Sequence, residues 1–372
     1  MSGLGIGQLA DVLGNLETQT LRVHPAQCSR LRHRLSTCTL CADHCPGQAI
    51  IWEDRSLRTI PEKCTGCGAC AAVCPTGAFE VQAPNSLEML RRIREMAREG
   101  EVLALICPTY LGTGRTVAGR CIEVNCLGRL DESVLVAAAA KGIPRLYLVD
   151  GACRDCRNSA AHAVTERVVQ RSNALLQAFG LPRRISLAPD PPAGTRASRR
   201  PPERASAVSR RDFFTLLAGR TRLAALSTLE SALGVQSHQP LTSIKGGELP
   251  RRLSLKHQLL LASLKQLQPP SDALLFRISG GPWAQFDFDG NCTGCQMCAT
   301  FCPTGALGKL DQQGAVGVTF RISHCTNCGL CRDICFRRAV NLSNEIDLGK
   351  VWEDAIVSMP MPAPEKRLPT MP

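Results

Sequence analysis

Short apolar runs alternate with amphipathic stretches in the middle of the chain and predict a small α/β domain. The runs VLALIC (102–107), CIEVN (121–125) and RLYLVD (145–150) have the continuous apolar character of buried parallel strands. Between the last two, DESVLVAAAAKG predicts a helix that begins near Asp131. We expect RISLA (184–188) to add one more strand. Strands and helices that alternate at these lengths favour a parallel sheet with right-handed crossovers.

Helical patterns flank this domain. In SLEMLRRIREMAREG (86–100), Leu87, Leu90 and Ile93 fall on one side of a predicted helix. Further along, SRRDFFTLLAG (209–219) has a helix-start pattern, and PRRLSLKHQLLLASLKQL (250–267) is amphipathic. The last two stretches predict a helical segment on the C-terminal side of the α/β domain.

A basic segment separates the two regions. Residues 189–208 are rich in Pro, Arg, Ala and Ser without apolar periodicity, so we expect a flexible linker there, and the tail from about residue 358 is also expected to be disordered. The net charge is +12, and residues 183–222 hold 10 arginines against 3 acidic residues, a balance of +7. This distribution favours a solvated tether or a surface for an acidic partner over nucleic-acid binding.

The 21 cysteines follow a repeat. CTGCGACAAVCP (64–75), CTGCQMCATFCP (292–303) and CTNCGLCRDICF (325–336) share one spacing, and CTLCADHCP (38–46) is an imperfect fourth copy. Where the fourth copy needs a leading cysteine, position 35 is leucine, and Cys28 is the candidate substitute. Because we expect the chain to be in the reducing cytoplasm, dense cysteines indicate metal ligands and not disulfides.

Three cysteines spaced by three residues, with a fourth further on, are typical of [4Fe-4S] sites, whereas zinc prefers two separated pairs. The fourth cysteine of such a motif ligates the cluster of the other motif, so cross-ligation is predicted in both halves of the chain. Without Cys28, the first site would hold a three-iron or labile cluster. The four predicted ligand sets are Cys28, Cys38, Cys41 and Cys74; Cys64, Cys67, Cys70 and Cys45; Cys292, Cys295, Cys298 and Cys335; and Cys325, Cys328, Cys331 and Cys302.

The two cysteine-rich stretches resemble bacterial dicluster ferredoxins over residues 26–83 and 285–345. The resemblance implies two [4Fe-4S] clusters and one-electron transfer in each unit. The chain departs from the pattern in two places: Phe336 follows Cys335 where proline is usual, and Leu35 stands where a cysteine is expected.

Four cysteines follow the predicted parallel strands. Ligands gather beyond the carboxyl ends of such strands, so Cys107, Cys126, Cys153 and Cys156 are expected to meet there, while Cys121 stands at the start of a strand and is excluded. A [2Fe-2S] cluster and a structural zinc ion both use all four cysteines. A redox dithiol at Cys153 and Cys156 uses two, and the residues alone leave the three possibilities open.

ICPTY, CLGRL (126–130) and the stretch through GACRDC to GLPRR are similar to the iron-sulfur delta subunit of methyl-viologen-reducing hydrogenases, over about residues 102–188. The resemblance implies a flavodoxin-like sheet that carries one [2Fe-2S] cluster and connects redox partners. This chain has a single cysteine at the first strand end and a Cys-x-x-Cys pair flanked by Arg154 and Arg157, both of which depart from the family.

Together, these features predict an α+β and α/β multidomain protein with two ferredoxin-like dicluster domains flanking a small parallel domain. We expect a non-catalytic electron-transfer subunit, with four [4Fe-4S] clusters and one [2Fe-2S] cluster, that serves a hydrogenase, formate dehydrogenase or heterodisulfide-reductase-like flavoprotein. A redox sensor that binds nucleic acid or an acidic partner through the basic linker is the alternative. No membrane span is expected. The predicted divisions are 1–25 (N-terminal segment), 26–84 (ferredoxin), 85–188 (α/β), 189–208 (linker), 209–270 (helical), 271–345 (ferredoxin) and 346–372 (tail).

Overall fold

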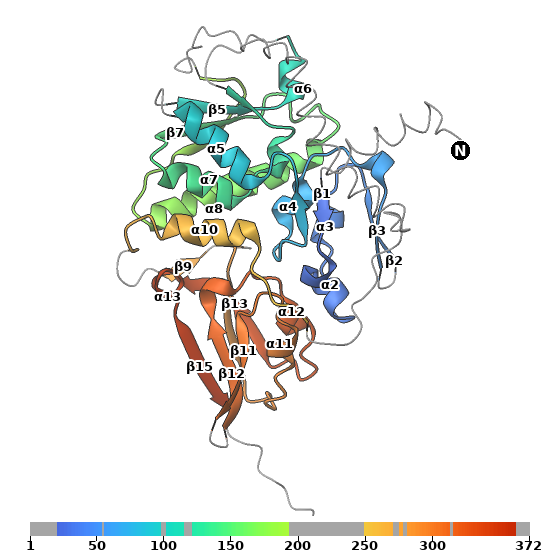
Figure 1. Cartoon of the computed structure of the whole chain (residues 1–372), viewed down its shortest axis with the longest axis vertical. Helices are drawn as coiled ribbons and strands as arrows, with labels where there is room; N and C mark the ends of the chain where they lie inside the picture. The colour runs from blue at the N-terminus through green and yellow to red at the C-terminus, as the bar shows by residue number, and fades with distance from the viewer. Residues whose placement is uncertain are drawn as a thin grey trace, which may run out of the picture.

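Three units are packed together in the computed structural model of the chain (Figure 1). The middle unit lies at one end of the molecule, the C-terminal unit at the other, and the N-terminal unit lies beside their junction. Of the predicted linker and the helix-start pattern at 209–219, only residues 189–192 are described. The structure describes residues 21–53, 56–97, 102–114, 121–192, 249–270, 275–277, 281–312 and 315–361.

The middle unit is a four-stranded parallel sheet in the order β6-β5-β7-β8. This is the order of the first four strands in flavodoxin-like folds, and it reverses between β5 and β7. The apolar runs form the strands because both of their faces are buried: Leu103 and Leu105 lie in the main apolar core, and Ala104 and Ile106 pack in a smaller cluster with Tyr110. The elements are α5 (Ser86–Ala97), β5 (Val102–Ile106), α6 (Pro108–Leu111), β6 (Cys121–Glu123), α7 (Glu132–Ala140), β7 (Arg145–Val149), α8 (His162–Ala178) and β8 (Ile185–Ala188).

Helix α7 begins at a side-chain cap. The carboxylate of Asp131 accepts hydrogen bonds from the backbone N–H groups of Ser133 at 2.9 Å and Val134 at 3.3 Å, which satisfies two of the free donors at the helix start. In α5 the buried face consists of Met89, Leu90 and Ile93. Leu90 and Ile93 are buried as predicted, whereas Leu87, expected on the same face, lies in the first turn of α5 and is 51% exposed.

The N-terminal unit has two antiparallel strand pairs, β1-β4 and β2-β3, around short helices. It has a separate apolar core that includes Leu31, Leu57 and Phe79. Its elements are β1 (Leu21–Val23), α2 (Ser29–Arg32), α3 (Leu40–Asp43), β2 (Ile50–Glu53), β3 (Ser56–Thr59), α4 (Ala69–Val73) and β4 (Phe79–Val81).

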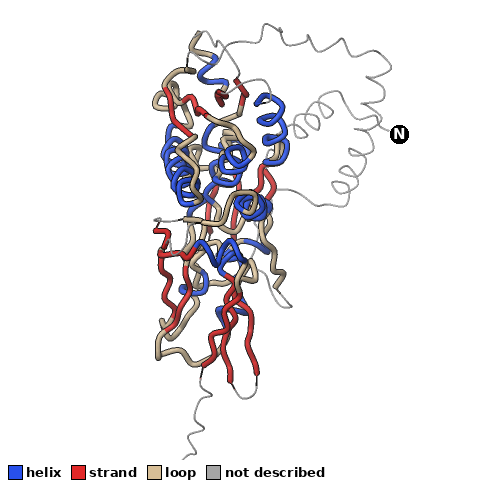
Figure 2. Tube along the Cα trace, turned by 90° about the vertical axis from the view of Figure 1, so that its left-hand side faces the viewer, coloured by secondary structure: helices blue, strands red, loops and turns tan. Residues whose placement is uncertain are grey.

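The C-terminal unit contains the pairs β10-β13 and β14-β9 and the three-stranded sheet β11-β12-β15. In Figure 2 strands project from the end of the molecule opposite the middle unit. The tail was expected to be disordered from about residue 358. Instead, residues 358–361 belong to strand β15, whose six residues pair with β12. Its elements are β9 (Leu275–Arg277), β10 (Gln285–Phe288), α11 (Met297–Phe301), β11 (Leu307–Gln312), β12 (Ala315–Arg321), α12 (Leu330–Asp333), β13 (Val340–Ser343), β14 (Glu345–Asp347), α13 (Leu348–Glu353) and β15 (Ile356–Met361).

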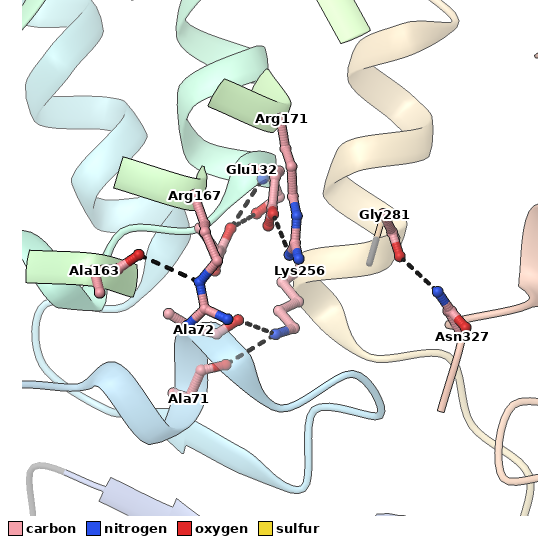
Figure 3. A network of polar contacts seen from close by, with 11 residues as sticks. Ala71, Ala72, Glu132, Ala163, Arg167, Arg171, Lys256, Gly281 and Asn327 are labelled. Atoms are coloured by element: carbon pink, nitrogen blue, oxygen red, sulfur yellow. Dashed lines mark hydrogen bonds and ion pairs between the residues drawn. The ribbon is translucent and has the colours of Figure 1, made fainter. Parts of the chain in front are cut away.

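Helix α10 (Leu255–Leu264) connects all three units. It packs along α7, and the ammonium group of Lys256 donates to the carbonyl oxygens of Ala71 and Ala72 in α4, each at 2.9 Å (Figure 3). On the other side, His257 Nε2 lies 2.8 Å from the carbonyl oxygen of Ser323. The predicted amphipathic helix is therefore contacted on several sides.

Within the described residues, no helix is long and apolar enough to cross a membrane.

Candidate metal centres

The three complete cysteine motifs share one loop conformation. In each loop the residues just before and just after the middle cysteine have positive φ angles, a region that L-residues with a Cβ rarely adopt. Glycine occupies four of these six positions, and the loops bend there so that successive cysteine side chains turn inward. The pairs are Gly66 and Gly68, Gly294 and Gln296, and Asn327 and Gly329.

In the C-terminal unit, the cysteines gather around two pockets, each lined by three cysteines from one loop and the fourth from the other. The thiols raise one another's pKa: burial is the main cause for Cys328, whose pKa rises to about 12, and Cys302 and Cys325 add to it. Burial likewise raises the pKa of Cys298 to about 12, with contributions from Cys295, Cys292 and Cys335. One pocket is lined by Cys302, Cys325, Cys328 and Cys331, and the other by Cys292, Cys295, Cys298 and Cys335.

The N-terminal unit repeats this arrangement. Burial raises the pKa of Cys41, and the neighbouring thiols of Cys74, Cys28 and Cys38 raise it further. Burial also raises the pKa of Cys70, and the thiols of Cys67, Cys41, Cys45 and Cys64 raise it further. The thiols of each expected set, including Cys28, are therefore electrostatic neighbours, and Cys41 of the first set also acts on the second.

Cys28 occupies the position of a leading cysteine. It directly follows a 3-10 turn, as do Cys64 and Cys325, and in all three the cysteine N–H donates to the carbonyl oxygen three residues earlier. The sequence carried a signal for this equivalence, because PAQC and PEKC both place proline three residues before the cysteine. Leu35, at the position given by the regular spacing, is 47% exposed.

In the middle unit one pocket is lined by Cys107, Cys126, Cys153 and Cys156. These residues follow the carboxyl ends of β5, β6 and β7, on both sides of the point where the strand order reverses. Burial raises the pKa of Cys153 to about 12, and Cys107, Cys126 and Cys156 contribute. Cys121 begins β6, and burial raises its pKa to about 11.

The donors around these pockets suit iron-sulfur clusters. Thiolates gathered this closely repel one another, and bound iron relieves that repulsion. Backbone N–H groups of Ala49, Ala78 and Asn158 donate to the sulfurs of Cys45, Cys74 and Cys156, each at 3.2 Å. Such hydrogen bonds tune cluster potentials.

Two buried polar atoms that line the pockets have no partner among the described residues. They are the Thr326 hydroxyl, beside Cys325, and the Asn158 side-chain oxygen, beside Cys156. The four-cysteine pockets therefore fit clusters, whereas no group of three or more His, Cys, Asp or Glu side chains in the described part of the chain is arranged to hold a single metal ion.

Family comparisons agree with the layout of these sites. A 4Fe-4S binding domain matches residues 57–80, a 4Fe-4S dicluster domain matches 291–339, and the delta subunit of methyl-viologen-reducing hydrogenase matches 116–193. No solved structure matches the chain significantly.

Two curated relatives are similar to short stretches of the chain. An uncharacterized ferredoxin of Methanocaldococcus jannaschii is 41% identical over 46 residues, which cover 12% of this chain and 74% of that protein. Pyruvate synthase subunit PorD of Thermotoga maritima is 30% identical over 56 residues, 15% of this chain and 54% of that subunit. The domains are those of iron-sulfur proteins of electron transport. The chain therefore belongs to the ferredoxin family, and a hydrogenase delta-subunit domain stands between its two iron-sulfur units.

Proposed function

We propose that the chain relays single electrons through four [4Fe-4S] clusters and one [2Fe-2S] cluster, between a redox enzyme and another carrier. The observation that carries this proposal is the grouping of cysteines into five sets of four, in which each ferredoxin-type set combines three sulfurs of one loop with one from the other. Each set would hold one cluster, and a cluster of either type accepts and returns one electron at a time.

The middle unit is the proposed link to the N-terminal unit. The Cys67 thiol contributes to the raised pKa of Cys126, so the middle set and one N-terminal set are electrostatic neighbours. Clusters in adjacent sets would pass electrons between units without bond chemistry. We propose that this chain is a non-catalytic subunit and that its partner is a hydrogenase, a formate dehydrogenase or a heterodisulfide-reductase-like flavoprotein, in keeping with the delta-subunit domain.

The proposed location is the cytoplasm. All 21 cysteines are free, which suits the reducing conditions that iron-sulfur ligands require.

Iron and acid-labile sulfide analysis with Mössbauer spectroscopy tests the proposal on anaerobically purified chain. Four cubane clusters and one two-iron cluster require about 18 iron atoms per chain. About 16 iron atoms per chain without a two-iron signal would show that the middle unit holds no [2Fe-2S] cluster. A chain that holds zinc in place of iron would overturn the proposal.

A further inference from the structure

The N-terminal unit contains an insertion at its first cysteine motif. Regular spacing would place the leading cysteine at 35, but it stands at 28, seven residues earlier. The extra residues form α2 (Ser29–Arg32) and the turn after it. Both ends of α2 are buried, since Ser29 is 3% and Arg32 2% exposed.

Arg32 reaches out of its own unit into the C-terminal unit. Its Nε donates to the carbonyl oxygen of Phe301 at 3.0 Å, and Nη2 donates to that of Cys302 at 3.5 Å. Its Nη1 donates to the carbonyl oxygens of Ala26 at 2.6 Å and Pro250 at 2.7 Å. A buried guanidinium is tolerated because these carbonyls satisfy its donors, so Arg32 is a fixed positive charge between the two units.

The guanidinium of Arg32 lies next to one predicted cluster site. The carbonyl oxygen that accepts from Nη2 at 3.5 Å belongs to Cys302, which lines the pocket with Cys325, Cys328 and Cys331. A fixed cation next to a cluster stabilises the form that carries the extra electron and so raises the reduction potential.

Further contacts of the insertion fix this junction. The rings of His33 and Phe301 pack edge to face, with their centroids 4.7 Å apart. The backbone N–H and the hydroxyl of Thr37 both donate to Oδ2 of Asp333, at 3.0 and 3.1 Å. The two ferredoxin units are therefore docked by Arg32 and His33 of the insertion, together with Thr37, which follows it.

Helix α2 touches both cysteine sets. Cys28 of the N-terminal set directly precedes it, and Arg32 at its end donates to the carbonyl oxygen of Cys302 in the C-terminal set at 3.5 Å. Ser29, in its first turn, also acts on the C-terminal set: burial raises the pKa of the Cys328 thiol, and the Ser29 side chain acts in the opposite direction. One turn of helix therefore spans the distance between the two sets.

We propose that α2 is the crossing point for electrons between the two ferredoxin units, and that Arg32 and Ser29 raise the reduction potential of the site formed by Cys302, Cys325, Cys328 and Cys331. This inference rests on the proposed function. The step moves one electron: the donor site is oxidised by one electron, the acceptor site is reduced by one, and no bond forms or breaks. The electron comes from an external one-electron reductant, for which dithionite serves in the test.

The test uses full-length chain with its clusters and compares Arg32→Gln, Arg32→Lys and Ser29→Ala with wild type. Arg34→Gln is the matched control, because it removes the same charge two residues away at an exposed position. Electron paramagnetic resonance is followed through a reductive titration. We expect Arg32→Gln to lower the midpoint potential of one cluster and Arg32→Lys and Arg34→Gln to stay near wild type.

Ser29→Ala should lower the same midpoint by less. In freeze-quench samples taken after substoichiometric dithionite, it should also slow the equilibration of electrons between the units several-fold. Unchanged midpoints and rates in Arg32→Gln and Ser29→Ala would overturn the inference. If Arg32→Gln loses iron, Ser29→Ala alone decides it. Wild-type chain without iron would refute the proposed function, whereas full iron with unaltered potentials would refute only the role of α2.

Discussion

Replacing Cys28 with alanine tests the least regular of the proposed ligands. The other three members of its set, Cys38, Cys41 and Cys74, stay in place, so we expect the site to retain a three-iron cluster. The change in iron content is then about one atom per chain out of about 18. Cys28 is 8% exposed, and deletion of one buried sulfur costs about 1 kcal/mol, which is too little to unfold the unit.

The assay is iron analysis with Mössbauer and electron paramagnetic resonance spectra of Cys28→Ala beside Cys121→Ala. The control loses a cysteine that begins β6, outside the five sets, and should keep the wild-type iron content. A second variant, Cys28→Ala with Leu35→Cys, restores the regular spacing at a position that is 47% exposed, and it should not recover the lost iron. Full iron in Cys28→Ala, or recovery through position 35, would refute the assignment of Cys28.

Three further outcomes follow from the structure. Replacing Cys153 and Cys156 together with alanine should remove about two iron atoms per chain and leave the cubane signals intact; loss of cubane iron instead would contradict a separate middle site. Burial lowers the pKa of His257 to about 4, so its contribution to stability is full above its ordinary pKa of about 6.5 and declines as the pH falls toward 4. The drop in Tm between pH 7 and pH 5 should therefore be smaller in His257→Gln than in wild type, and equal drops would oppose this. Asp131→Ala should destabilise the middle unit by about 1 kcal/mol, seen as a lower Tm, while Asp131→Asn keeps most of the cap; an unchanged Tm in Asp131→Ala would show that the cap is dispensable.

Local spacing carried most of the information about the cysteines. A three-residue interval fixes how a loop turns, so the sequence alone could predict which sulfurs gather, and the parallel sheet followed from its apolar runs. The role of Cys28 was harder to predict, because the insertion hides its equivalence to Cys64. The proline three residues before each cysteine was the signal in the sequence, and the shared 3-10 turn shows the equivalence in the structure. That these sulfurs bind iron stays a prediction.

Contacts between distant parts of the chain were not predictable. Arg32 meets Phe301 across 269 positions, and nothing in the local pattern marks it as buried. The helix α10 had a recognisable pattern, but its place between three units depends on Lys256 and His257 meeting different partners. The tail at 358–361 forms a strand because β12 offers a free edge, a feature of tertiary structure.

The central claim is that one chain stores and passes single electrons at five sites, and coulometric reduction of the anaerobic protein tests it most directly. The account predicts that each chain takes up about five electrons, one per cluster, and returns them on reoxidation. Uptake of less than one electron per chain by iron-loaded protein would contradict it.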